Sequence, residues 1–575
     1  MRSACASVTR PTAEALRPWI EACGRHLRTE LRTNPIKRTI AAGLAALSAC
    51  TGAISDPGND DPPILPPIPG GMVFEPLSPV VRRLTRDEYE QTIKDVLGVT
   101  LTGTQLASIP ADRPLEGFAH VASGQTVLPT HVLAYNELAG VVTRDSSFEA
   151  FVSAHSECTE ANTTCGSAFI RSAGSALFRH PLSDDEAAPF DTLFSFMLSE
   201  EADYAEATGA VVESMLQSPG FIYLLQHERD ATAGSPDEDT RVIGGYEMAS
   251  KLSYFLWGAP PDEALYEAAE DGRLDTADGV ESEAMRMLSD SARVRRSVAR
   301  FLIDWARLES LPDEDGLKDD LIASAVEYYV DRVERDANLF ALFSDQEVFL
   351  TPRLAEAYGE SGAGDEVLVV RRPEGGGILG QPGVIAGMTN ADGGEIVARG
   401  LFLLGQLFCG NPPNFPDDLQ SDIDEFVAAQ PEDASDRDIA AARLERDECG
   451  MCHQSFDPLA YGFERFDHRG LPRTEDVHGN TLRVDGWIPP GLHSDASPQT
   501  YDGYASYMQL LEGNSRIRAC LAQKQVEFAT ASRIGLDQQG AVTDLVEAAT
   551  ESSTHRNMVR ILVRHDVFRT MERAQ

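Results

Sequence analysis

The sequence is short of basic residues and of recognisable catalytic motifs, and each shortage excludes a class of protein. Its 49 lysines and arginines stand against 91 aspartates and glutamates, a formal net charge of −42. Nucleic acid and anionic lipid headgroups would be repelled by such a surface, so no nucleic-acid partner is expected. No nucleophile elbow, phosphate-binding loop or metalloprotease helix occurs in the sequence, which leaves catalytic residues unassigned.

A long apolar run is also missing. The apolar segment near the N-terminus, residues 39–50, is too short and too rich in alanine to span a membrane. It follows a basic head, residues 1–40, that holds eight lysines or arginines and three glutamates. A basic region, a brief apolar run and small residues are typical of an export signal. The letters LSAC at 47–50 resemble the lipobox of bacterial lipoproteins, which implies that Cys50 is lipidated after removal of the signal. A buried N-terminal helix with a lone cysteine is the alternative.

Export sets the expected location and the state of the cysteines. The proline-rich residues 51–77 predict an extended tether, so the body of the protein is expected in the cell envelope, anchored by lipid to the outer membrane. Cysteine is scarce, with nine in 575 residues. Because exported thiols tend to be oxidised, Cys158 and Cys165 are predicted to close a small disulfide loop. Cys409 and Cys520 either form a second, long-range bridge or remain two buried thiols.

The most specific feature is CGMCH at 449–453, the C-x-x-C-H signature of covalent haem attachment. In that chemistry Cys449 and Cys452 bind the haem vinyl groups and His453 ligates the iron. Three other interpretations stay open: a thioredoxin-like pair, a zinc site completed by Cys409 and Cys520, and a plain disulfide. The helical flank lacks the βαβ surround of a thioredoxin site, and a plain disulfide leaves His453 unexplained. One covalent haem c is therefore the predicted cofactor.

Two features flank the motif. Residues 417–438 hold nine acidic residues and a single arginine. They form either a plain solvated loop or a field that stabilises oxidised iron and steers a basic partner. Downstream, a set of four charged residues is predicted to form an ion-pair and turn scaffold rather than a catalytic pair. These four are Asp457, Glu464, Asp467 and Arg473.

The spacing of apolar residues predicts a mainly α fold. From residue 80 onward apolar side chains recur at helical intervals, and capping boxes are expected at Thr85 with Glu88 and at Ser183 with Glu186. Strand-like alternation is scarce. Helices are expected across 206–228, 248–256, 285–305 and 321–343, and short strands only near 367–370 and 481–484.

Four stretches follow one another in a recognisable order: RRLTRDEYEQTIKDVLG at 82–98, FRHPLSDDE at 178–186, LSYFLW at 252–257 and the C-x-x-C-H motif. Together they resemble a family of large secreted proteins first catalogued in planctomycetes and common in myxobacteria. The resemblance implies export and a multidomain helical array with a cytochrome c-like haem-binding region. It implies no reaction, because the domains of this family have no established activity.

The resemblance also sets the expected domain boundaries. The expected parts are a lipoprotein signal peptide (1–50), a tether (51–77), helical domains at 78–145, 165–230 and 240–365, a C-x-x-C-H-bearing domain at 370–475 and a C-terminal helical domain at 480–575.

By the same resemblance Met388 belongs to the domain of the motif, and it is the predicted distal iron ligand. Met508, His468 and His493 are the alternatives. The sequence thus predicts an exported, lipid-anchored c-type haem protein in extracytoplasmic electron transfer, whose redox partner protein it does not identify. The alternative is a cell-surface polymer-binding or polymer-degrading protein with purely structural cysteines.

Overall fold

The computed structural model describes most of the chain beyond residue 76. The described residues are 77–78, 81–158, 160–224, 240–313, 315–361, 364–389, 395–411, 420–476, 478–535, 538–549 and 552–572. The predicted export signal, Cys50 and the proline-rich tether lie outside them. Within these ranges, no helix is both long enough and apolar enough to cross a membrane.

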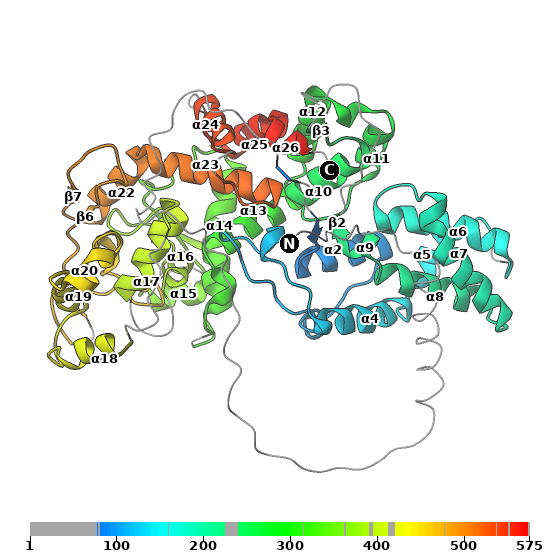
Figure 1. The fold of residues 1–575 in the computed structure, drawn as a ribbon. Helices are drawn as coiled ribbons and strands as arrows, with labels where there is room; N and C mark the ends of the chain where they lie inside the picture. The colour runs from blue at the N-terminus through cyan, green and yellow to red at the C-terminus, as the bar shows by residue number, and fades with distance from the viewer. Residues whose placement is uncertain are drawn as a thin grey trace, which may run out of the picture. The chain divides into compact units, whose positions relative to one another are not determined.

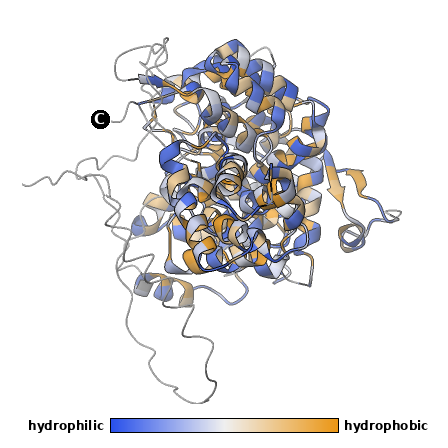
Figure 2. Cartoon of the chain, turned by 90° about the vertical axis from the view of Figure 1, so that its right-hand side faces the viewer, coloured by the Kyte–Doolittle hydropathy of each residue, from blue (hydrophilic) through white to orange (hydrophobic). Residues whose placement is uncertain are grey.

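The predicted mainly α fold is confirmed. The described residues form 25 α-helices and four two-stranded antiparallel sheets (Figure 1). Figure 2 shows apolar and polar residues mixed along individual helices, as expected for helices that each bury one face.

One apolar core joins the first helices of the described chain. They are α2 (Arg86–Leu97), α3 (Gly103–Leu106), α4 (Pro129–Thr143), α5 (Phe148–His155), α6 (Thr163–Phe178), α7 (Asp184–Ser199), α8 (Tyr204–Leu216) and α9 (Pro219–Ile222). Strand β1 (Arg82–Arg83) pairs with β2 (Tyr223–Leu224) and brings the two ends of this segment together. Both predicted capping boxes are present, at the starts of α2 and α7. The disulfide Cys158–Cys165 links the start of α6 to the segment before it.

A second, larger core holds most of the remaining helices. The remaining helices begin with α10 (Gly245–Leu256), α11 (Glu263–Glu270), α12 (Ala277–Met287), α13 (Ser291–Trp305), α14 (Lys318–Glu334), α15 (Pro352–Ala357), α16 (Pro382–Gly387), α17 (Glu395–Phe402), α18 (Gln420–Ala428) and α19 (Asp436–Leu444). They end with α20 (Asp447–His453), α21 (Asp457–Ala460), α22 (Tyr504–Gly513), α23 (Ser515–Thr530), α24 (Gln539–Ala548), α25 (His555–Arg564) and α26 (Asp566–Arg569).

The strands of this part join segments that are close or very distant in sequence. Strand β4 (Glu347–Leu350) pairs with β5 (Leu368–Arg371), and β6 (Gly486–Ile488) pairs with β7 (Gln499–Tyr501). The pair of β3 (Thr240–Val242) and β8 (Thr570–Glu572) fastens the end of the described chain to the start of α10.

Four expected elements differ from the structure. The helix expected across 206–228 ends at Leu216, and Pro219 begins the separate short helix α9. The helix expected across 285–305 is two helices, because the Asp290 side chain caps a new start by accepting a hydrogen bond from the Arg293 N–H. The helix expected to reach residue 343 ends at Glu334, where the chain turns with Asp336 at φ +53°. The strand expected at 481–484 is wrong: Thr481 forms only an isolated bridge with Glu475, and the strand lies at β6 instead.

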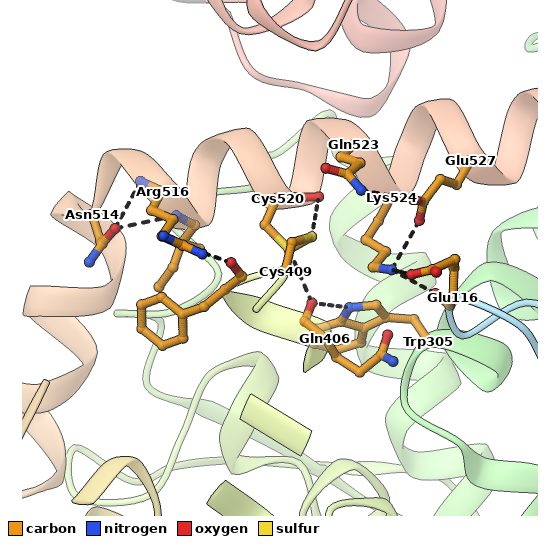
Figure 3. The surroundings of a disulfide bond; sticks show 12 residues. Glu116, Trp305, Gln406, Cys409, Asn514, Arg516, Cys520, Gln523, Lys524 and Glu527 are labelled. Carbon is orange, nitrogen blue, oxygen red and sulfur yellow. Dashed lines mark hydrogen bonds and ion pairs between the residues drawn. A yellow bond between two sulfur atoms is a disulfide. The ribbon is translucent and has the colours of Figure 1, made fainter. Parts of the chain in front are cut away.

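The long-range disulfide Cys409–Cys520, one of two possibilities open from the sequence, is present and fastens the expected C-x-x-C-H-bearing domain to α23 (Figure 3). It follows a π-helical turn, η5 (Leu403–Leu407), whose Gln406 carbonyl accepts a hydrogen bond from the Trp305 indole at 3.1 Å. On the other side of the bridge, Arg516 Nε donates to the Phe408 carbonyl at 3.0 Å. The Arg516 bond therefore joins the same two segments as the disulfide, whereas the Trp305 bond ties η5 to α13.

Candidate cofactor attachment site

The C-x-x-C-H motif forms the short helix α20, which follows α19 through a tight turn. Gly450 is buried there, and a Cβ at this position would lie 2.5 Å from the Leu444 carbonyl oxygen. Glycine therefore lets α20 fold back closely onto the end of α19. Cys449 and Cys452 are three residues apart on the helix and lie on one side of it. Both are half-buried free thiols, whereas Met451 between them is 72% exposed.

His453 is held by a fully buried carboxylate. Its Nδ1 lies 3.1 Å from Asp457 Oδ1, and the other oxygen, Asp457 Oδ2, accepts hydrogen bonds from Arg443 Nε and Nη2 at 3.0 and 2.6 Å. A carboxylate can only accept, so Nδ1 carries the imidazole proton and Nε2 presents its lone pair. Among the described residues no group is hydrogen-bonded to Nε2. The Phe456 ring packs against the imidazole at 4.8 Å between centroids.

This geometry fits a metal-ligating histidine. Histidines that bind a metal through one ring nitrogen commonly donate the other N–H to a carboxylate, which fixes the ring and raises the basicity of the ligand. The arrangement supplies that second contact together with two unbridged thiols on the same short helix. Sequence reasoning had Asp457 only as a scaffold residue and missed Arg443, because the fourteen-residue spacing between them carries no periodic signal.

The zinc and disulfide interpretations lose support. Cys409 and Cys520, the two further zinc ligands considered, are joined to each other, and Cys449 and Cys452 are not. In the ranges the structure covers, no group of three or more His, Cys, Asp and Glu side chains is arranged to hold a metal ion.

The candidate distal ligands lie in varied surroundings. Met388, directly after α16, is buried in the larger core at 2% exposure, and Met508 on α22 is buried to the same extent. His493 has both ring nitrogens engaged, Nε2 with the Ile488 carbonyl and Nδ1 with the Asp495 N–H. The His468 carbonyl accepts a hydrogen bond from Thr389, one residue after Met388. No contact recorded for the described residues joins these side chains to His453, so Met388 as distal ligand stays a prediction.

The predicted ion-pair and turn scaffold is present after the motif. Asp467 Oδ1 accepts from the backbone N–H groups of Arg469 and Leu471 at 2.9 and 2.8 Å, which closes a turn. Arg473 donates to the Glu464 carbonyl and to Glu395 Oε2 at 2.7 and 2.8 Å. A further member went unpredicted: Arg399 on α17 is buried and donates to the carbonyls of Phe463, Phe466 and Asp467.

Glu464 is the most perturbed carboxyl of this scaffold. Burial raises its pKa to about 7, although the nearby Arg437 guanidinium acts in the opposite direction. Its Oε1 is buried without a hydrogen-bond partner. Arg437 itself stacks over the Tyr461 ring at 3.1 Å, beside a small satellite core that includes Ile396 and Trp487.

The acidic stretch before the motif is solvated where the structure describes it. Seven of its nine carboxylate residues lie within the described residues, and all seven are exposed: Asp422, Asp424, Glu425, Glu432, Asp433, Asp436 and Asp438. They lie on α18, on α19 and on the turn between these helices, immediately before α20.

Four family models match successive parts of the chain, and all four are described as proteins of unknown function. PSD3 (DUF1587) matches residues 82–145, PSD5 (DUF1595) residues 165–225, PSD4 (DUF1592) residues 243–359 and PSCyt3 (DUF1588) residues 375–476. The C-x-x-C-H motif lies inside the PSCyt3 match. Searches of curated proteins and of solved structures found no match.

Proposed function

We propose that this chain, which belongs to the multidomain proteins of unknown function that carry these four domains, attaches one haem covalently and serves in extracytoplasmic electron transfer. The observation that carries the proposal is the pair of contacts from His453 and Arg443 to the buried Asp457 carboxylate, beside two free thiols. The name of the model that matches the motif-bearing region, PSCyt3, also alludes to cytochromes.

Each residue of the site has a defined task in this proposal. Cys449 and Cys452 would hold the haem by thioether bonds, and His453 Nε2 would be the proximal iron ligand. Haem bound there supplies a one-electron Fe(III)/Fe(II) couple. Asp457 fixes the tautomer and direction of the His453 ring, and Arg443 holds the buried Asp457 carboxylate in place. Phe456 limits rotation of the imidazole from the side.

The exposed carboxylates before α20 make the surface next to the site acidic. Negative charge near the motif stabilises the more positive, oxidised form of a redox centre and raises the local concentration of a positively charged partner. We therefore expect the redox partner protein to present a basic surface. Its association rate should fall as ionic strength rises, because salt screens exposed charges.

The test is expression in a periplasm together with the cytochrome c maturation machinery. The expected product carries one haem that survives denaturation and gives a pyridine haemochrome spectrum. Cys452→Ser should weaken or abolish attachment, whereas the matched control Met451→Ala, at the exposed position beside it, should leave attachment intact. His453→Ala should remove the low-spin spectrum. A mature chain without a haem mass increment, or with haem attached when both thiols are replaced, contradicts the proposal.

Anchoring by lipid is a separate part of the proposal. Cys50, outside the described residues, is the residue we expect to be acylated, with the body held at the cell envelope through the proline-rich segment. A Cys50→Ser variant should move from the membrane fraction to the soluble periplasmic fraction. An unchanged distribution would reject the lipid anchor and leave the haem proposal unaffected.

A further inference from the structure

A cavity of about 220 Å³ lies away from the C-x-x-C-H motif, where α2, α10, α13 and α23 meet. These helices come from the first and third matched regions and from the C-terminal part of the chain. Much of the wall is apolar. Its larger apolar and aromatic members are Leu224, Tyr254, Phe255, Ile303 and Phe528.

Among the described residues that line this cavity, the charged groups are unequal in number. Four are cations and three are carboxylates: Arg82, Lys251, Arg296, Arg300, Asp87, Glu88 and Glu247. All three carboxylates have arginine partners. Arg82 binds both oxygens of Glu88 at 2.7 and 2.9 Å, and Arg300 binds Asp87 at 2.6 Å. Glu247 is bound at 2.9 Å by Arg241, which does not line the cavity.

Lys251 and Arg296 are the two cations left over. Within the described part of the chain, neither forms an ion pair with a carboxylate. Lys251 Nζ donates to the Phe568 carbonyl at 2.7 Å and lies 4.7 Å from the centre of the Phe568 ring. Arg296 Nη1 donates to the Trp257 carbonyl at 3.2 Å. Carbonyl oxygens satisfy some of their N–H groups but supply no negative charge.

The two remaining titratable groups described on the wall, His120 and Tyr254, add no charge to the balance, because burial raises the pKa of Tyr254 and keeps its hydroxyl protonated. Burial lowers the pKa of His120 to about 4, so its ring is neutral, and its Nε2 is engaged with the Phe528 carbonyl at 2.7 Å. Burial likewise lowers the pKa of Lys251 to about 7, although the nearby Glu247 carboxylate, which is bound by Arg241, acts in the opposite direction. A desolvated cation that forms no ion pair of its own is costly, and a bound anion would offset that cost.

We propose that this cavity binds a small organic monocarboxylate with an apolar body, whose carboxylate faces Lys251 and Arg296. The two cations without ion pairs select one negative group, and the aromatic and aliphatic wall selects the body attached to it. A phosphate or a polyanion fits less well, because most of the wall would leave its oxygens unpaired. This binding site is independent of the proposed haem attachment.

Isothermal titration calorimetry on the full mature chain tests the proposal, with naphthalene-2-carboxylate as the probe and naphthalene-2-carboxamide as its neutral counterpart. We expect the carboxylate to bind at least tenfold more tightly than the amide. Lys251→Met and Arg296→Gln should each remove most of this preference. The matched control is Arg293→Gln, because Arg293 lies on the same helix but stacks on Trp257 outside the cavity. It should leave the preference unchanged.

Equal binding of the two probes, absence of carboxylate binding, or a preference that survives in the double variant would each overturn the proposal. Circular dichroism of every variant establishes that the fold is retained. Because Lys251→Met alters a helix face that packs on Phe568, Arg296→Gln, on a different helix, provides a second, independent measurement. Loading with haem should not change the result.

Discussion

At the scale of single residues, the site is built from a buried carboxylate that holds a partly exposed imidazole in place. Asp457 is completely buried, and a buried carboxylate is costly unless it is paired and hydrogen-bonded. Arg443 supplies two hydrogen bonds and His453 a third. The cost of burying Asp457 is thereby offset by contacts that also fix the direction of the imidazole.

Replacing Asp457 with asparagine should raise the midpoint potential of the haem-loaded protein by some tens of millivolts. A neutral amide polarises the Nδ1–H bond less than a carboxylate does, so the ligand becomes less basic and oxidised iron less stable. Spectroelectrochemical titration measures the shift. Glu448→Gln, which removes one exposed carboxylate from the same helix, is the matched control and should shift the potential far less. An unchanged or lower potential in Asp457→Asn would refute the role given to this carboxylate.

Glu464 should make the folded state less stable as the pH rises. Burial raises its pKa to about 7, above the value of an exposed glutamate, so between these two values the folded state binds more protons than the unfolded state. The stability that the protonated Glu464 carboxyl contributes to the folded state is therefore complete at low pH and is lost as the pH rises toward 7. The difference in free energy of unfolding between Glu464→Gln and the parent chain should grow by about 2–3 kcal/mol, in favour of the variant, from roughly pH 5 to pH 8.

Urea denaturation at the two pH values measures this change. Glu475→Gln, at an exposed position of the same region, is the control and should follow the parent chain at both pH values. A Glu464→Gln variant that parallels the parent at both values would show that the Glu464 carboxyl is not perturbed in the folded protein.

At the scale of elements, α17 packs closely on α21 and thereby holds the segment next to the motif in place. Gly400 on α17 faces the Phe456 carbonyl, and a Cβ there would lie 2.4 Å from that oxygen. Phe456 immediately precedes α21 and packs on His453. The absence of a side chain at residue 400 thus lets α17 approach the segment that carries the imidazole contact.

Gly400→Ala should lower the free energy of unfolding by about 1–3 kcal/mol, because α17 and the Phe456 backbone must separate to admit a methyl group. Chemical denaturation followed by circular dichroism measures the loss. Gly405→Ala is the matched control five residues later, where no atom would lie within 4 Å of the added Cβ. Equal stability of the two alanine variants would mean that the close approach at Gly400 is not a constraint.

Local elements were predictable where a few neighbouring residues decide them. Thr85 with Glu88, and Ser183 with Glu186, each satisfy backbone N–H groups within one turn, so the sequence alone marks the helix start. The break between α12 and α13 was not predictable from periodicity, because the apolar residues continue across it and only the cap at Asp290 separates the helices. The C-x-x-C-H motif was equally recognisable from the sequence, because the residues that define it are five consecutive ones.

Contacts between distant segments could not be read in the same way. Arg399 meets three carbonyls more than sixty residues later, and Arg443 meets Asp457 only after the chain has turned through α20. The Cys409–Cys520 bridge was one of two open possibilities, because pairing depends on the approach of η5 to α23 and not on spacing. Nothing in the sequence distinguishes Lys251, because only the approach of α13, α23 and α26 to α10 encloses it.

At the scale of the whole molecule, the described chain is held together by two large apolar cores and by pairings that cross the sequence. The first core contains the helices from α2 to α9, and the second contains most of the helices from α10 to α26. Arg300 on α13 binds Asp87 on α2, and the β3–β8 pair joins the two ends of the larger core. Two disulfides also cross-link the described residues, and they close loops of very different length: 7 residues in one case and 111 in the other.

Removing the long bridge should therefore destabilise the protein more than removing the short one. In the chain-entropy account a disulfide acts by restricting the unfolded chain, which predicts a loss of about 5 kcal/mol for Cys409→Ala with Cys520→Ala and about 2 kcal/mol for Cys158→Ala with Cys165→Ala. Differential scanning calorimetry of the two double variants measures both losses, each with the other bridge intact as its control. Equal losses, or a larger loss for the short bridge, would mean that packing around the cysteines outweighs the restriction of the unfolded chain. The expected order instead gives the long bridge the larger part in holding the motif-bearing region against α23.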